Sequence, residues 1–192
     1  MAADSPLRSL QDLVAAARAR PGEITYGTTG VGSDDHLLVI ALEEAAGLKP
    51  INHVPLNGMA PLGTALIGGH LQVGAFNMSE GLALLQDGRI RALGQAAARW
   101  AATPDAPTFR EQGLDVISGA TRGVVAPPHL PAEIRQRLEA AFRAALADPA
   151  FAREAERLGL PLSPQIGEDY RRTMLATEGE LRGLWRRRPW RE

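Results

Sequence analysis

Residues 27–36 (GTTGVGSDDH) concentrate three glycines, two threonines and a serine ahead of two aspartates and a histidine. Glycines let a backbone approach a ligand closely, and hydroxyl groups add neutral hydrogen-bond donors. A short apolar run precedes the stretch and a helical pattern follows it, and helix N-termini attract anions through their unpaired N–H groups. The stretch is therefore a candidate anion site made of Thr28, Thr29, Gly30, Gly32 and Ser33. The alternative is an ordinary tight turn with Ser33 as a helix N-cap.

The same stretch contains the residue types of a hydrolytic triad in Ser33, Asp34, Asp35 and His36. A triad needs side chains that converge from separate elements, whereas neighbours at the start of a helix point in different directions. The two aspartates are better explained as charges that interact favourably with the positive end of a helix. The sequence therefore predicts no catalytic residue and a protein that is not an enzyme.

Cofactor and metal sites are also disfavoured by residue spacing. The pattern G-x-x-G-x-G-S matches neither the dinucleotide fingerprint nor the P-loop. The four histidines, at positions 36, 53, 70 and 129, lack the short spacing of metal ligands. We therefore predict no metal and no cofactor.

Two further loops follow apolar runs and precede helical patterns. PLNGMAP (55–61) contributes Asn57, Gly58 and Met59, and AFNMSEG (75–81) contributes Asn77 and Ser79. Arg122, in TRGVVAP, offers a guanidinium that can bind a carboxylate through two hydrogen bonds. The alternatives are a turn asparagine that bonds its own backbone and an arginine in a structural salt bridge.

Strand-like and helix-like segments alternate over the first half of the chain, which predicts a mostly parallel sheet covered by helices. A capping-box pattern at Ser9 and Asp12 begins the first helix, and Gly47 ends the second. The expected strands are 24–26, 51–54, 71–76, 90–93 and 122–128. The expected helices are 10–20, 34–46, 61–67, 80–87, 131–147, 149–158 and 167–186, with one helical turn at 109–112. In a parallel sheet the binding crevice lies at the carboxyl ends of the strands.

Composition narrows the class of protein. The 192 residues carry a net charge of −1, which argues against a general nucleic-acid binder, and 45% of them are hydrophobic, which is enough for a core. The arginine-rich tail LWRRRPWRE is better explained as a solvated helix end than as a nucleic-acid site. The chain has no cysteine, no apolar run of membrane-spanning length and no visible signal peptide.

Five blocks of the sequence occur in a familiar order: PGEITYGTTGVGSDDHL, NHVPLNGMAPLGTALIGGHLQV, GRIRALGQ, TPDAPTFREQGL and RGVVAPPHLPAEI. Over about residues 4–185 the chain resembles the substrate-binding proteins of tripartite tricarboxylate transporters, the TctC or Bug family. The resemblance implies a lobe of the type II periplasmic-binding-protein fold with additional C-terminal helices. It also implies a periplasmic location, capture of a small carboxylate without catalysis, and delivery of that ligand to membrane permease subunits.

Within this resemblance the glycine loop receives a ligand carboxylate, and His36 supports that loop structurally. Residues 4–121 correspond to the second lobe, and residues 122–192 to a return strand and helices that pack on the first lobe in the family. The chain departs from the family in length, because most of the first lobe has no counterpart. It also has Asn77 where the family frequently has Asp, an exchange that favours acids without an amino group.

The difference in length leads to two expectations and leaves other functions open. Binding by this chain alone is expected to be weak or undetectable, and the C-terminal helices are expected to expose apolar faces that promote homo-oligomerisation or fold back onto the lobe. A ligand-sensing regulatory domain, a small α/β enzyme that uses the glycine loop as an anion site, and a structural remnant without a ligand remain the alternatives.

Overall fold

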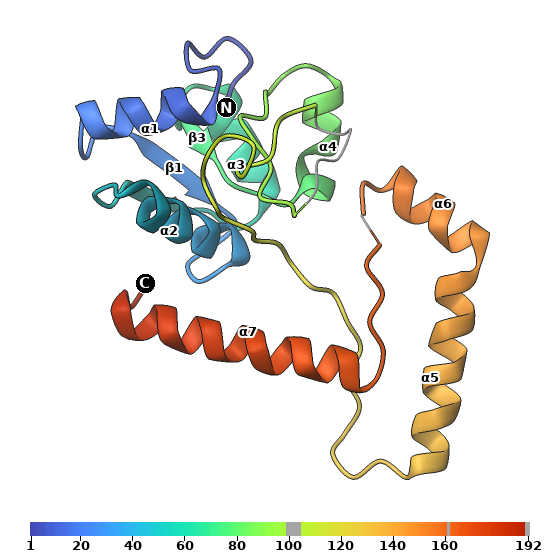
Figure 1. Cartoon of the computed structure of the whole chain (residues 1–192). Helices are drawn as coiled ribbons and strands as arrows, with labels where there is room; N and C mark the ends of the chain where they lie inside the picture. Colours follow the sequence, from blue (N-terminus) through green and yellow to red (C-terminus); the bar gives the residue numbers. More distant parts are fainter. Residues whose placement is uncertain (99–104, 161, 191–192) are drawn as a thin grey trace. The chain divides into compact units, whose positions relative to one another are not determined.

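The computed structural model describes residues 1–98, 105–160 and 162–190 of the chain (Figure 1). Contacts divide the chain into two compact units, Met1–Thr121 and the part that begins at Arg122. The first unit contains the β-sheet and four helices, and the second contains three helices among its described residues.

The sheet of the first unit consists of three parallel strands: β1 (Thr25–Thr28), β2 (Asn52–Pro55) and β3 (Val73–Gly74). Their spatial order is β2-β1-β3, and Tyr26 of β1 lies opposite His53 of β2 and Val73 of β3. After the central strand β1, the chain thus forms β2 on one side of it and then β3 on the other side. Such a reversal of strand order is where open α/β sheets form their ligand crevice.

Four helices flank this sheet: α1 (Leu10–Ala19), α2 (Asp34–Ala46), α3 (Met59–Ile67) and α4 (Met78–Gln86) (Figure 1). The predicted N-terminal cap of α1 and the predicted C-terminal cap of α2 are both confirmed. Ser9 and Asp12 form the capping box of α1, and Gly47 ends α2 in the left-handed conformation with φ of 60°.

Alternate residues of β1 face two separate apolar clusters. Tyr26 belongs to a cluster with side chains of α1 and α2, such as Leu13 and Val39. Gly27 faces the opposite layer, where a Cβ would lie 2.5 Å from Leu71 Cδ1. A Cβ at position 27 would therefore displace the Leu71 side chain, so the close packing of this layer favours glycine.

Several element boundaries differ from the sequence-based expectation. α3 begins at Met59 rather than at Pro61, and β3 covers two residues of the expected range 71–76. The expected strand 90–93 is wrong: Ile90 forms only an isolated antiparallel bridge with Ala2. The expected strand 122–128 is also wrong, because this segment pairs with no strand among the described residues and Val125 is 79% exposed.

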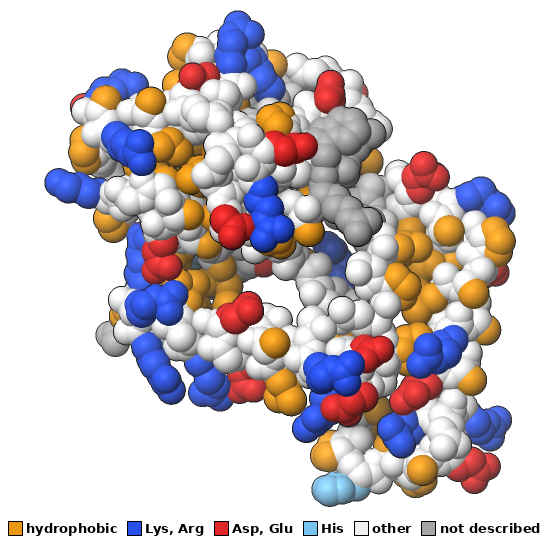
Figure 2. All heavy atoms as spheres, viewed as in Figure 1, with side chains coloured by type: hydrophobic (Ala, Val, Ile, Leu, Met, Phe, Trp, Pro, Cys, Tyr) orange, Lys and Arg blue, Asp and Glu red, His pale blue; other side chains and the backbone are white. Residues whose placement is uncertain are grey.

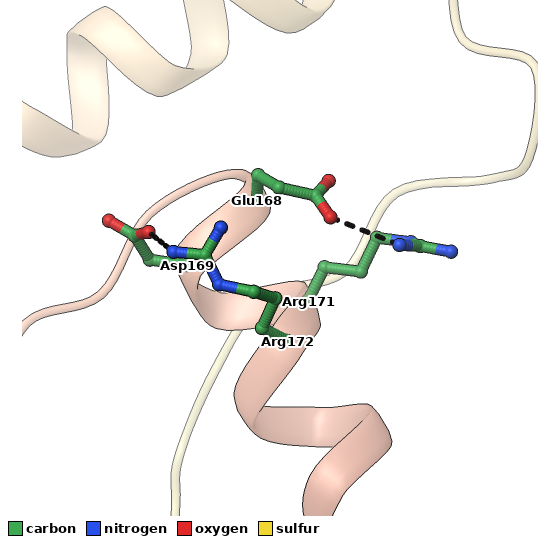
Figure 3. A network of polar contacts seen from close by, with 4 residues as sticks. All are labelled: Glu168, Asp169, Arg171 and Arg172. Carbon is green, nitrogen blue, oxygen red and sulfur yellow. Dashed lines mark hydrogen bonds and ion pairs between the residues drawn. The ribbon is translucent and has the colours of Figure 1, made fainter.

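The second unit contains α5 (Ala132–Ala147), α6 (Pro149–Arg157) and α7 (Glu168–Arg187). Side-chain pairs one helical turn apart stabilise the first turns of α7: Glu168 with Arg171 at 3.0 Å, and Asp169 with Arg172 (Figure 3). Such exposed pairs contribute about 0.3–0.5 kcal/mol each.

Apolar side chains of the second unit reach its surface, as expected from the sequence (Figure 2). On α5, Leu138 is 43% exposed and Phe142 42%, and Phe151 of α6 is 45% exposed. On α7, Leu175 is 50% exposed. These helices therefore do not bury their apolar faces completely within the described structure.

Candidate functional site

Three helices of the first unit begin close to the carboxyl ends of the three strands. Residues 29–33 join β1 to α2, residues 56–58 join β2 to α3, and residues 75–77 join β3 to α4. Because the strands are parallel neighbours, these three loops and the N-termini of α2, α3 and α4 lie along one edge of the sheet. We call this edge the rim.

The glycine loop of the rim is held together by its own polar groups. Ser33 caps α2, since its Oγ accepts from His36 N at 3.2 Å and donates to the Gly30 carbonyl at 2.9 Å. Gly32 has φ of 74° and donates its N–H to His36 Nδ1 at 3.0 Å. The loop is thus an ordered turn in which the N–H groups of Gly32 and His36 already have acceptors.

Thr28 lies at the start of the loop with 0% of its surface exposed. Its Oγ1 donates to the Gly30 carbonyl at 3.1 Å and lies 2.6 Å from His53 Nε2. His53 in turn stacks on His36, with ring centroids 4.0 Å apart. Burial, and secondarily the nearby His36, lowers the pKa of His53 to about 4, so this ring is neutral near pH 7.

The loop also contains a buried carboxyl group. Asp35 is 3% exposed, and its Oδ2 accepts from Thr29 Oγ1 at 2.6 Å. Burial raises the pKa of Asp35 to about 6, against the lowering effect of the Thr29 hydroxyl, and the charges of Asp34 and Glu80 act in the same direction as burial.

The glycine loop and the start of α4 are connected directly. Asn77 Nδ2 donates to Asp34 Oδ2 at 2.8 Å, and Glu80 Oε2 accepts from Asn77 N at 3.1 Å. The side-chain amide of Asn77 therefore positions Asp34, and its second N–H is the one left for a ligand.

Seven main-chain N–H groups of the rim have no hydrogen-bond partner among the described residues, whereas that of Thr29 bonds the Asp35 carboxyl group. The seven belong to Val31, Asp34, Asp35, Met59, Ala60, Met78 and Ser79. Six of them are the first two N–H groups of α2, α3 and α4, the positions that the helical bonding pattern leaves open. Such groups, together with the helix dipole, suit an anion.

The predicted site residues fall into three groups. Thr28 ends β1, and Thr29, Gly30, Gly32, Ser33, Gly58, Met59, Asn77 and Ser79 lie on the loops or first helical turns of the rim. Asn57 is exposed on the β2–α3 loop, and Arg122 is exposed at the start of the second unit. Ligand binding by any of these residues stays a prediction.

Two surface hollows among the described residues are lined by residues outside the glycine loop. One is lined by α3 and α4 residues including Met59, Thr64 and Glu80, and the other by α7 residues including Met174 and Trp185. Among the described residues no group of three or more His, Cys, Asp or Glu side chains is placed to hold a metal ion. No helix within the described ranges has the length and apolar character needed to cross a membrane.

Sequence reasoning did not identify His53, Asp34 and Asp35 as parts of the loop's support. The position of His53 could have been inferred from strand pairing, because the register of β1 and β2 places His53 opposite Tyr26, near the end of β1. The aspartates were assigned only a general interaction with the helix dipole, whereas they bond Asn77 and Thr29 individually.

A family model described as the tripartite tricarboxylate transporter family receptor, TctC, matches residues 1–175. The chain belongs to this family. It is 33% identical over 154 residues to a UPF0065 protein of Agrobacterium vitis, an alignment that covers 79% of this chain and 44% of that protein. It is 32% identical over 150 residues to a UPF0065 protein of Cupriavidus necator, an alignment that covers 78% of this chain and 45% of that protein. This TctC-family chain therefore spans about half the length of the curated relatives it matches.

Solved structures of TctC proteins share its fold. A TctC solute binding protein from Polaromonas, without ligand, superposes with a TM-score of 0.81 at 27% identity over 97% of this chain and 64% of that chain. A protein of R. palustris with adipate superposes with a TM-score of 0.81 at 27% identity, over 96% of this chain and 62% of that chain. MatC from Rhodopseudomonas palustris with bound malate superposes with a TM-score of 0.68 at 25% identity, over 82% of this chain and 54% of that chain. The predicted α/β fold class and the predicted family are thus confirmed.

Proposed function

We propose that this chain contributes the rim of a solute-binding site that captures small carboxylates for a tripartite tricarboxylate transporter. The observation that carries the proposal is the group of seven rim N–H groups without partners among the described residues, six of them at the N-termini of three adjacent helices. Charge-assisted hydrogen bonds from such groups would bind a ligand carboxylate without catalysis. Family relatives crystallised with adipate and with malate support the ligand class.

Residues 4–121 serve in this proposal as one lobe, and residues 122–192 as the segment that the family places on its other lobe. Asn57 would approach the ligand from outside the glycine loop, and ligand binding by Arg122 stays a prediction. Because the chain spans about 45% of its curated relatives, it forms only part of the surface that would enclose a ligand, and affinity is expected to be weak. The periplasm and the permease subunits of the transporter are the corresponding location and partners.

The apolar side chains of α5, α6 and α7 belong to the same proposal. Their exposure favours self-association of the chain, since exposed apolar patches of this kind bind partners. Light scattering at increasing concentration measures this directly. A compact monomer at every concentration would contradict self-association and leave the ligand proposal unaffected.

Ligand-observed NMR with the full chain tests carboxylate capture, because it detects millimolar affinities. Adipate and malate are expected to bind, whereas adipamide, which has adipate's length without its charges, is not. A matched pair of variants addresses the N–H groups themselves. Met78→Pro removes the first N–H of α4 at a position where proline fits, because Asn77 before it has φ of −69° and ψ of 144°, while Met78→Ala keeps that N–H.

We expect Met78→Pro to weaken adipate binding about tenfold relative to Met78→Ala, the effect of one hydrogen bond to a charged group. Equal binding of adipate and adipamide would contradict the proposal. Isothermal titration that gives micromolar affinity for the chain alone would contradict the expectation of weak binding.

A further inference from the structure

Two histidines from different elements stack against the glycine loop. His53 comes from β2 and His36 from the first turn of α2, and their ring planes are 23° apart at a centroid distance of 4.0 Å. Tyr26 of β1 also stacks on His53, with centroids 4.8 Å apart. His36 is 7% exposed and Tyr26 2%, whereas His53 is half-buried, so the three rings lie at the edge of the core at the end of the sheet.

Each imidazole contacts one end of the loop through a ring nitrogen. His53 Nε2 lies 2.6 Å from Thr28 Oγ1, at the last residue of β1. His36 Nδ1 accepts the N–H of Gly32 at 3.0 Å, just before α2. Thr28 Oγ1 also accepts from Gly30 N at 3.3 Å, so the two rings fix the loop at its start, its middle and its end.

We propose that His36 and His53 are positioning residues of the anion site: as a stacked, uncharged pair they hold the glycine loop in the conformation that directs the N–H groups of Val31 and Asp34 to a carboxylate. This inference rests on the proposed function. Neither histidine needs to touch the ligand, because both act through Thr28 and Gly32.

The arrangement depends on the protonation state of both rings. His36 Nδ1 is an acceptor only while it carries no proton, and a proton there would place a donor against the Gly32 N–H and break the bond. Two charged imidazoles at 4.0 Å would also repel each other. Acid should therefore release the loop.

Other titratable groups face the same cluster. Asp35 lies beside His36 on α2, with its pKa raised to about 6 by burial, and Asp34 and Glu80 contribute negative charge near it. Tyr26 faces the rings from β1. Because Asp35 also bonds the loop through Thr29, the variant Asp35→Asn is needed to separate its titration from that of His36.

The test uses the full chain labelled with ¹⁵N and requires no ligand. In the wild type, the Gly32 amide shift is expected to follow the protonation of the His36 ring, observed at its own ring resonances, as the pH is lowered. His36→Asn places a carbonyl oxygen where Nδ1 accepts, so the Gly32 amide should stay protected and its shift should no longer titrate. Asp35→Asn should leave the Gly32 titration as in the wild type.

Two further variants separate hydrogen bonding from stacking. His36→Leu should accelerate exchange of the Gly32 amide about fivefold to tenfold, the effect of one lost hydrogen bond. His53→Phe keeps an aromatic ring but removes Nε2, and should shift the amides of Thr28 and Gly30. His53→Gln, which restores a polar atom near the position of Nε2, should return them toward the wild type.

The positioning role is overturned if the Gly32 shift does not follow His36 in the wild type, if it still titrates in His36→Asn, or if it ceases to titrate in Asp35→Asn. If His36→Leu does not fold, the wild type and His36→Asn still test the positioning role.

Adipate binding then separates the positioning role from the proposed function. Wild type that does not bind adipate contradicts the proposed function and leaves the Gly32 result standing. Folded His36→Leu that binds adipate as tightly as the wild type overturns the positioning role alone, since we expect about fivefold weaker binding.

Discussion

Replacing Asn77 by aspartate should destabilise the first unit by opposing two carboxylates at the rim. In the structure Asn77 Nδ2 donates to Asp34 Oδ2 at 2.8 Å, and this bond connects the glycine loop to the first turn of α4. Asn77→Asp keeps the shape of the side chain, removes the donor and places a second negative charge at that distance.

The expected loss follows from two contributions. A hydrogen bond to a charged group contributes about 1.5–3 kcal/mol. Repulsion between unit charges reaches about 4 kcal/mol at 4 Å with an effective dielectric of 20, but these partly exposed side chains can rotate into water and relieve most of it. We therefore expect the free energy of unfolding to fall by about 2–3 kcal/mol near pH 7.

The loss should depend on pH in a defined direction. A neighbouring carboxylate raises the pKa of one member of the new pair in the folded state, so the folded state binds a proton more tightly than the unfolded chain. The deficit is therefore complete above that raised pKa and shrinks as the pH falls through it.

Urea unfolding of the ¹⁵N-labelled chain measures this effect at resonances of the first unit, since the two units need not unfold together. The double variant Asp34→Asn/Asn77→Asp exchanges donor and acceptor and should recover most of the loss. An unfolding midpoint for Asn77→Asp equal to that of the wild type near pH 7, or a deficit that persists unchanged in acid, would refute the reasoning.

Three other predictions concern buried groups. The pKa of Asp35 is raised from 3.8 to about 6, so the folded state binds its proton more tightly than the unfolded chain. The free energy of unfolding should therefore fall as the pH rises through this window. Asp35→Asn should flatten that pH dependence in urea titrations at several pH values. Leu62→Ala, at a side chain that is 0% exposed, should lose about 2–5 kcal/mol, whereas Leu138→Ala, 43% exposed on α5, should lose less than about 1 kcal/mol in the same assay. Gly81→Ala would place a Cβ 2.0 Å from Phe76 Cε2 and should lower the melting temperature; an unchanged melting temperature would mean that the Phe76 ring moves freely.

The sequence predicted the elements of the first unit where local chemistry decides them. Ser9 with Asp12, and Gly47, mark helix ends through hydrogen bonds between near neighbours, and the structure contains both caps. Alternating strands and helices likewise predicted the parallel sheet. The strand expected at 90–93 failed for the opposite reason: Ile90 has a strand-like sequence, but its partner is Ala2, about ninety residues away, and local pattern carries no information about that pairing.

The same distinction separates the predicted and unpredicted parts of the rim. Glycines and hydroxyls between a strand and a helix indicate an anion site from composition alone, and Ser33 is the helix cap that this spacing implies. The contacts of His53 with Thr28, and of Asn77 with Asp34, join residues 25 and 43 positions apart in the sequence. They depend on strand order and register, which no single stretch of sequence determines.

A titration of the ¹⁵N-labelled chain with adipate, followed at the backbone amides, tests most directly whether unpartnered rim N–H groups bind a carboxylate. We predict saturable shifts that are largest at Val31, Asp34 and Asp35, with smaller shifts at the first turns of α3 and α4 and none with adipamide. Saturable shifts confined to residues outside the rim, or no shift at the rim up to the solubility limit of adipate, would contradict the account.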